Sequence, residues 1–160
     1  FTGTIADNIR FGAPDASMEE VIHAAKIAQA YDFIMEKPHQ FDELITEGAT
    51  NVSGGQKQRL SIARALIRKP LIYIYDDSFS ALDFRTDAKL RKALKTEVTR
   101  SIVLIVAQRV STIMDADRIV VLDEGKIAGI GTHRELLSSC PLYYEIAASQ
   151  LSEGELQYEC

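Results

Sequence analysis

The stretch Asn51-Val52-Ser53-Gly54-Gly55-Gln56-Lys57-Gln58-Arg59-Leu60 decides how the rest of the chain is interpreted. It places two adjacent glycines between a serine and a run rich in Gln, Arg, Leu, Ile and Ala that lasts until Pro70. Glycines at a helix start let backbone N–H groups approach a ligand, because no Cβ stands in the way. The unpaired amides and the positive end of the helix dipole then form an anion site, above all for phosphate. Ser53 stands where an N-cap belongs, and its hydroxyl could also bind a phosphate oxygen.

Taken alone, Ser-Gly-Gly is equally compatible with an ordinary glycine turn before an amphipathic helix. A basic cluster lies along and just after the same predicted helix: Lys57, Arg59, Arg64, Arg68 and Lys69. This cluster is either a solvated helix face or a surface that contacts phosphate or a partner. The net charge of −5 and the sequence pI near 5.2 argue against a protein that binds nucleic acid through a basic surface.

Length and composition predict a globular chain with one good core. The chain has 160 residues, of which 46% are hydrophobic. Cys140 and Cys160 are far apart, show no metal-ligand spacing and fit a reducing compartment. No apolar run approaches the roughly 20 residues that a membrane span needs. The opening Phe1-Thr2-Gly3-Thr4-Ile5 has neither an initiator Met nor a signal peptide, which is typical of the middle of a longer polypeptide.

Hydrophobic periodicity and breakers predict an α-helical block followed by alternating strands and helices. Strand-and-turn structure is expected over 1–12, helices over 17–28 and 30–36, a polar loop over 40–50, and a helix over 55–68. Strands are expected over 71–75, 102–107, 118–122 and 127–130, the last two as a hairpin, with helices over 84–98, 111–114 and 132–149. The tail 152–160 is expected to fray. The pattern predicts an α/β fold with an inserted α-helical subdomain.

The apolar run 71–75 ends in the acidic pair Asp76-Asp77. A short, continuously apolar run is typical of a parallel strand that is buried on both faces. Carboxylates at the carboxyl end of such a strand point into the crevice where ligands of these sheets bind. Asp76 could hold Mg²⁺ through water, and Asp77 could orient a water for attack on a γ-phosphate. In isolation, the same pattern also describes a strand that leads into a helix N-cap.

Together, these segments resemble the nucleotide-binding domain of ATP-binding cassette (ABC) transporters. The stretch at 51–60 resembles the signature motif, with Val52 where Leu is usual, and 71–76 resembles Walker B with Asp76 in the magnesium position. Ser80-Ala81-Leu82-Asp83 resembles the D-loop, although Asp83 could also simply cap the next helix. The wording of 4–12, 107–112 and 129–136 resembles exporters. The resemblance implies ATP and Mg²⁺ as cofactors and an incomplete P-loop ATPase parallel-sheet core.

Two departures from the family pattern concern the catalytic positions. The family's Glu after Walker B is Asp77 here, and its switch His is Gln108. A carboxylate one methylene shorter holds the attacking water less well, and Gln cannot carry a positive charge as His does. The pair resembles the degenerate half of a heterodimeric exporter. Because Ser53, Gly54, Gly55 and Gln56 are intact, the resemblance implies that this chain completes an ATP site whose catalytic residues lie on a non-identical partner.

A phosphate-binding G-x-x-x-x-G-K-[S/T] motif does not occur anywhere in the chain. The resemblance therefore covers about the last two-thirds of a nucleotide-binding domain. The absent strand is expected between the Walker B strand and the strand ending at Gln108, which predicts an unfilled slot in the sheet. Alone, the chain is expected neither to bind ATP well nor to hydrolyse it.

The resemblance also implies an organisation and partners for the chain. Segment 1–14 would follow the Q-loop, 15–69 would form the helical subdomain, 70–150 would carry Walker B, D-loop and switch, and 151–160 would be a tail. The helical block 15–46 would dock on transmembrane domains at the cytoplasmic face of the cell membrane. Three alternatives stay open: a non-transporting ABC clamp in DNA repair or translation, a homodimeric exporter, and a module that only binds or regulates.

Overall fold

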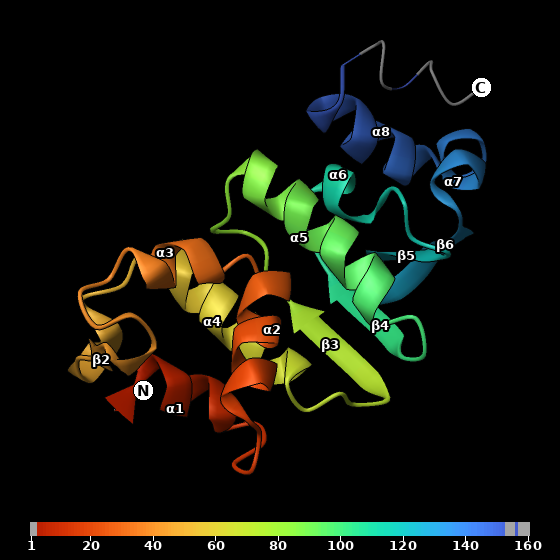
Figure 1. Cartoon of the computed structure of the whole chain (residues 1–160). Coiled ribbons are helices and arrows are strands. Elements are labelled where there is room, and N and C mark those ends of the chain that lie inside the picture. Colours follow the sequence, from red (N-terminus) through yellow and green to blue (C-terminus); the bar gives the residue numbers. More distant parts are fainter. Residues whose placement is uncertain (1–2, 153–155, 157–160) are drawn as a thin grey trace. The chain divides into compact units, whose positions relative to one another are not determined.

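The computed structural model describes residues 3–152 and 156, and it divides into two compact units (Figure 1). The first unit is Phe1–Val106 and the second is Ala107–Cys160. The predicted fraying of the tail concerns 152–160, most of which lies outside the described residues.

An α-helical block forms the first part of the first unit. Its helices are α1 (Ile5–Arg10), α2 (Met18–Ile27), α3 (Tyr31–Met35) and α4 (Gly54–Leu66). Helices α1 and α2 both pack on α4, as Figure 1 shows. Ile5, Ile34 and Ala63 are fully buried in the core that results. Helix α4 is therefore the central element of this helical block.

The prediction of strand-and-turn structure over 1–12 was wrong for most of the segment. Among the described residues of this segment, β1 (Gly3–Thr4) alone forms a strand, and α1 follows it directly. A capping box starts this helix, because Thr4 Oγ1 accepts from Asp7 N at 3.0 Å and Asp7 Oδ2 accepts from Thr4 N at 3.1 Å. The segment predicted as a loop also contains structure: β2 (Leu44–Ile45) pairs antiparallel with β1, between the short 3₁₀ helices η1 (Gln40–Asp42) and η2 (Glu47–Ala49).

A parallel pair of strands, β3 (Ile72–Asp76) and β4 (Ile102–Val106), completes the first unit. Helix α5 (Phe84–Glu97) connects them, and the register runs from Ile72 beside Ile102 to Asp76 beside Val106. The prediction of an unfilled strand position between β3 and β4 was wrong. They are direct neighbours, as is usual for consecutive parallel strands joined by one helical crossover.

The two faces of this strand pair differ. Tyr73 and Tyr75 of β3 are buried in the core beside α5, whereas Ile74 is 67% exposed and Leu104 of β4 is 53% exposed. The prediction that 71–75 is buried on both faces was therefore wrong. A continuously apolar strand can be buried on both faces. Among the described residues, however, helices cover only the face that carries Tyr73 and Tyr75.

The second unit contains an antiparallel hairpin and three helices. Strands β5 (Ile119–Asp123) and β6 (Lys126–Gly131) pair as predicted, and the turn residues Glu124 and Gly125 both have positive φ. Two positive φ values match the twist that short hairpin turns prefer. The helices that pack with this hairpin around one hydrophobic core are α6 (Val110–Ile113), α7 (His133–Ser139) and α8 (Pro141–Gln150).

The single helix predicted over 132–149 is in fact two helices. Pro141 is the first residue of α8, and Cys140 between the helices has extended backbone dihedrals. Proline favours the first helical turn but cannot continue a preceding helix, because it lacks an N–H and its ring clashes with the turn before it. Among the described residues, no helix is both long enough and apolar enough to cross a membrane.

Candidate functional site: the signature helix and the loops after β3 and β4

The N-terminus of α4 is built by a reciprocal cap. Ser53 Oγ accepts from Gln56 N at 3.2 Å, and Gln56 Oε1 accepts from Ser53 N at 2.9 Å. Ser53 and Gly54 are both exposed. The first N–H groups of a helix have no intrahelical partner, and the dipole makes this end positive. The signature segment therefore presents an exposed, capped helix N-terminus that is suited to a phosphate.

The two glycines of this segment have different environments. A Cβ on Gly55 would lie 2.9 Å from the carbonyl oxygen of Ala81, closer than real contacts allow, whereas a Cβ on Gly54 would meet only the Ala81 side chain at 3.8 Å. Gly55 thus lets the loop that follows β3 approach the signature helix closely. The structure brings together the signature and the predicted D-loop within one unit.

The acidic pair lies at the carboxyl end of β3, as expected for a ligand edge. Asp76 is the last residue of the strand, and both Asp76 and Asp77 are exposed. Asp77 N donates to Val106 O at 3.1 Å, and Asp77 then turns the chain with a φ of +48°. This left-handed conformation is uncommon for residues other than glycine, although Asp tolerates it better than most.

Magnesium is compatible with these residues. Among the described residues, no group of three or more His, Cys, Asp or Glu side chains could hold a metal ion. Mg²⁺ does not need such a cage, because it keeps several waters and is usually bound through one or two carboxylates together with substrate phosphates. The exposed carboxylates of Asp76 and Asp77 fit that requirement.

Asp83 caps α5 in this structure. Its Oδ1 accepts from Thr86 N at 2.9 Å, and its Oδ2 accepts from the Thr86 hydroxyl at 2.7 Å. These hydrogen bonds from Thr86 hold the pKa of the Asp83 carboxyl below its usual value. The capping role weighed in the sequence analysis is therefore present, and it leaves the side chain at the surface beside the signature.

Gln108 belongs to the second unit, where it precedes α6. Its side chain is exposed, and its backbone oxygen accepts from Gln150 Nε2 of α8 at 3.0 Å. Gln150 Oε1 in turn accepts from Val110 N at 2.9 Å. The loop that carries the predicted switch position is therefore held by a side chain from the last described helix.

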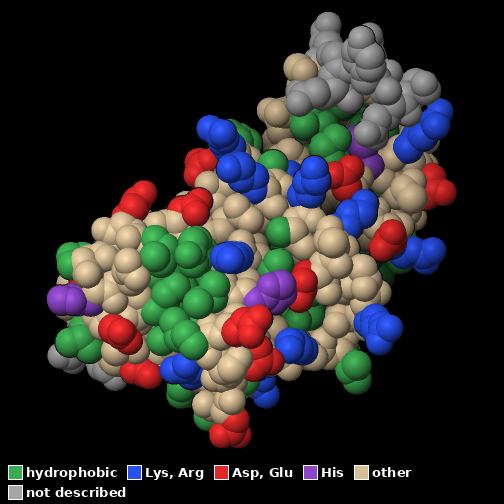
Figure 2. All heavy atoms as spheres, viewed as in Figure 1, with side chains coloured by type: hydrophobic (Ala, Val, Ile, Leu, Met, Phe, Trp, Pro, Cys, Tyr) green, Lys and Arg blue, Asp and Glu red, His purple; other side chains and the backbone are tan. Residues whose placement is uncertain are grey.

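Two arginines of the basic cluster, Arg59 and Arg64, form internal hydrogen bonds, whereas Arg68 is exposed. Arg59 Nη1 donates to Gln29 O at 2.8 Å, and Arg64 Nε donates to Asn8 O at 2.8 Å. Burial lowers the pKa of both guanidinium groups. On the face displayed in Figure 2, Lys and Arg side chains of the first unit alternate with Asp and Glu and form no continuous basic surface.

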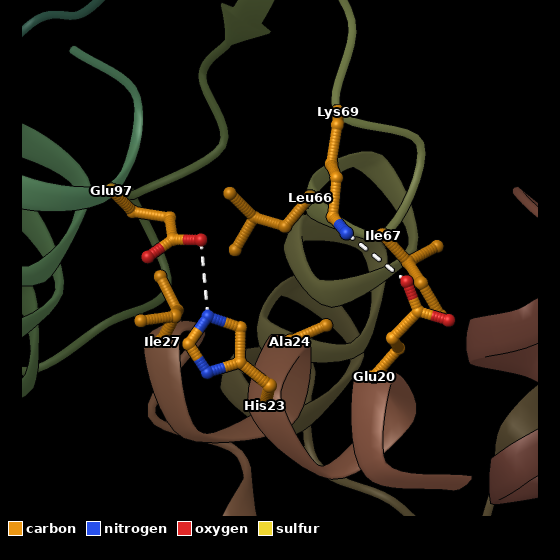
Figure 3. Close-up of a pocket in the computed structure, with 8 residues that line it drawn as sticks. All are labelled: Glu20, His23, Ala24, Ile27, Leu66, Ile67, Lys69 and Glu97. Carbon is orange, nitrogen blue, oxygen red and sulfur yellow. Dashed lines mark hydrogen bonds and ion pairs between the residues drawn. The ribbon is translucent and has the colours of Figure 1, made fainter. Parts of the chain in front are cut away.

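A small pocket of about 30 Å³ lies where α2, the end of α4 and the end of α5 meet (Figure 3). A hydrogen bond between His23 Nε2 and Glu97 Oε1 and an ion pair between Lys69 Nζ and Glu20 Oε1 flank it, each at 3.0 Å. Its volume matches about one water molecule. It contains none of the predicted site residues, so it is a packing defect between helices rather than a ligand site.

Two residues that contact the functional loops had no predicted role. Gln58 lies within the signature stretch but was not assigned a function, and Gln150 lies near the end of the chain where no motif occurs. Gln58 bonds to the loop after β3, and Gln150 bonds to the loop after β4. Neither could be found from local spacing, because each partner lies far away in sequence.

The chain is similar to ABC transporter proteins over nearly its whole length. The model of the family described as "ABC transporter" matches residues 2–80. The chain is 48% identical over 150 residues to the Bacillus subtilis protein named "Uncharacterized ABC transporter ATP-binding protein YfiB", covering 94% of this chain and 26% of that protein. It is 45% identical over 150 residues to human "ATP-binding cassette sub-family B member 5", covering 94% of this chain and 12% of that protein.

A solved structure shares the fold. The structure entitled "Structure of a bacterial Atm1-family ABC exporter with ATP bound" has a TM-score of 0.91 and 40% sequence identity, covering 96% of this chain and 27% of that one. The chain thus spans about a quarter or less of the length of these relatives.

Proposed function

Because this chain belongs to the ABC transporter family, as part of its ATP-binding domain, we propose that it serves an exporter that couples ATP hydrolysis to transport across a membrane. The similarity to a subfamily B protein and to a solved exporter supports the exporter class. The observation that carries the proposal is the exposed, capped N-terminus of α4, which Gly55 holds against the loop after β3. The same unit carries phosphate-binding amides at the start of α4 and a pair of exposed carboxylates at the end of β3.

The residues divide the chemistry as follows. Ser53, Gly54, Gly55 and Gln56 bind phosphate oxygens of ATP through the helix N-terminus. Asp76 would hold Mg²⁺, which would neutralise charge on the phosphates, and Asp77 would orient the attacking water. Gln108 donates a hydrogen bond toward the γ-phosphate. Asp83 belongs to the loop that faces the second nucleotide-binding domain.

The signature and the carboxylate pair serve two different ATP sites. In this proposal the signature completes the site of a second, non-identical nucleotide-binding domain, while Asp77 and Gln108 belong to a site that hydrolyses ATP weakly. Asp77 is one methylene shorter than the family's Glu, and Gln108 cannot take up a proton near neutral pH. The helical block 15–46 docks on the transmembrane domains at the cytoplasmic face of the membrane.

Restoring the family residues tests the weak site. In the full-length transporter purified with a partner whose own ATP site has been inactivated, Asp77→Glu combined with Gln108→His should raise ATP turnover about tenfold, because general-base positioning of this kind contributes 10²–10⁴-fold when complete. Unchanged turnover would contradict the weak-site proposal. Asp76→Asn in the same background serves as the control, because it should remove the gain by weakening Mg²⁺ binding.

A further inference from the structure

Two glutamine side chains hold the two loops that carry Asp77 and Gln108. Gln58 Nε2 on α4 donates to Asp77 O at 3.3 Å and to Ser80 Oγ at 3.2 Å, while its Oε1 accepts from Ala81 N at 3.0 Å. Gln150 on α8 donates to Gln108 O and accepts from Val110 N. We propose that Gln58 and Gln150 are positioning residues, each fixing the backbone of one catalytic loop through both ends of its carboxamide.

A carboxamide suits this task because it offers a donor and an acceptor in one rigid plane. In both loops it spans a backbone carbonyl and a backbone N–H that lie a few residues further along the chain. A carboxylate can only accept, and Lys or Arg can only donate. The side chain therefore closes the loop as a short piece of secondary structure would, although its helix is distant in sequence.

The loop after β3 needs this support. Asp77 has a φ of +48°, and such conformations persist for non-glycine residues only where the surroundings hold them. The Asp77 carbonyl receives the Ser80 hydroxyl at 3.0 Å as well as Gln58. Because the backbone at Asp77 sets where its carboxylate points, loosening it misplaces the carboxylate, and misplacement by 1 Å costs about 10²-fold in rate.

Gln58 also links two sites, and this consequence rests on the proposed function. It stands on the helix that begins at Ser53, so one rigid element carries the signature and grips the Asp77 loop. The close approach of Gly55 to Ala81 is a second, independent contact between the same two segments. The signature offered to the partner's ATP and the carboxylate at this chain's own site therefore move together.

Kinetics of the full-length transporter, purified with the same partner whose own ATP site has been inactivated, test the proposal. In the Asp77→Glu, Gln108→His background, adding Gln58→Ala or Gln150→Ala should reduce the tenfold gain in kcat to less than about twofold, with KM for ATP unchanged within about twofold. Such a split is expected of residues that position catalytic groups without touching ATP. The controls Ser61→Ala on α4 and Glu145→Ala on α8 are exposed neighbours and should preserve the gain. A full gain in both Gln→Ala variants would overturn the proposal.

Conservative variants and hydrogen exchange keep the test independent of the weak site. Gln58→Glu and Gln150→Glu retain the acceptor for Ala81 N and Val110 N but lose the donor. Exchange at these two amides should therefore rise about tenfold or more in the alanine variants and stay near wild type in the glutamate variants. If restoring Glu and His yields no gain in ATP turnover, the weak-site proposal fails. Amide hydrogen exchange then tests the positioning roles of Gln58 and Gln150 by itself. Equal exchange in wild type and alanine variants would overturn the positioning roles.

Discussion

The loop after β3 and the loop after β4 are held by the same device but to different degrees. Each has a glutamine carboxamide that spans its backbone. The loop after β3 is further packed against Gly55 and ends in Asp83, which caps a helix of 14 residues. The loop after β4 leads into α6, which has four residues and is not capped by the side chain of its N-cap residue. The comparison indicates that the signature side is built as a rigid block, whereas the switch side depends more on one side chain.

The largest effect is expected from filling the space between the signature and the loop after β3. Gly55→Ala should destabilise the chain by about 1–3 kcal/mol, because the new Cβ meets the Ala81 carbonyl oxygen at 2.9 Å and forces a backbone shift. Urea denaturation of the two alanine variants measures the difference. Gly54→Ala is the matched control and should stay within about 0.5 kcal/mol of wild type. Equal stability of the two variants would mean that this contact does not hold the loop.

Removing the cap of α5 should have the next largest effect. Asp83→Ala leaves Thr86 N without its acceptor and should lower the free energy of unfolding by less than Gly55→Ala does. Asp83→Asn retains an acceptor at the same position and should remain close to wild type at neutral pH, since Asn caps as well as Asp. Thermal unfolding of both variants provides the measurement, and similar losses in both would point to the charge rather than the cap.

The smallest expected effect is a loss of stability at acidic pH. The pKa of Asp83 is lower in the folded chain than its ordinary value of 3.8, because Thr86 donates to the carboxylate. A depressed folded pKa contributes stability that is present above the unfolded pKa and lost as pH falls through the folded pKa. Below about pH 4, the unfolding midpoint of wild type should therefore fall more steeply than that of Asp83→Asn. Parallel pH profiles for the two proteins would contradict this assignment.

Local chemistry was predictable from the sequence where its cause is local. The helix starts expected at Ser17 and Thr132 are both capping boxes in the structure, and the hairpin turn at Gly125 was also expected; each depends on residues a few positions apart. The helical start at Thr4 follows the same rule, and it was missed because Asp7 is less typical than Glu at the third helical position.

The remaining features depend on partners that lie far away in sequence. The direct pairing of β3 with β4 and the one-sided burial of β3 are properties of the assembled sheet, which apolar runs alone do not encode. Gln58 lies 23 residues from Ala81, and Gln150 lies 40 residues from Val110, so no spacing rule identifies them. The signature, by contrast, was recognisable because its serine, glycines and glutamine act within one helical turn.

ATP turnover by the full-length transporter subunit, purified alone and then together with its candidate partner, tests the central claim most directly. We predict negligible ATP turnover by the subunit alone and measurable turnover by the subunit with its partner. Replacing Ser53 by a bulky residue such as Phe should abolish that turnover, because the new side chain would block the exposed start of α4. Vigorous hydrolysis by the subunit alone would contradict the claim, because Asp77 and Gln108 would then suffice without a partner's catalytic residues.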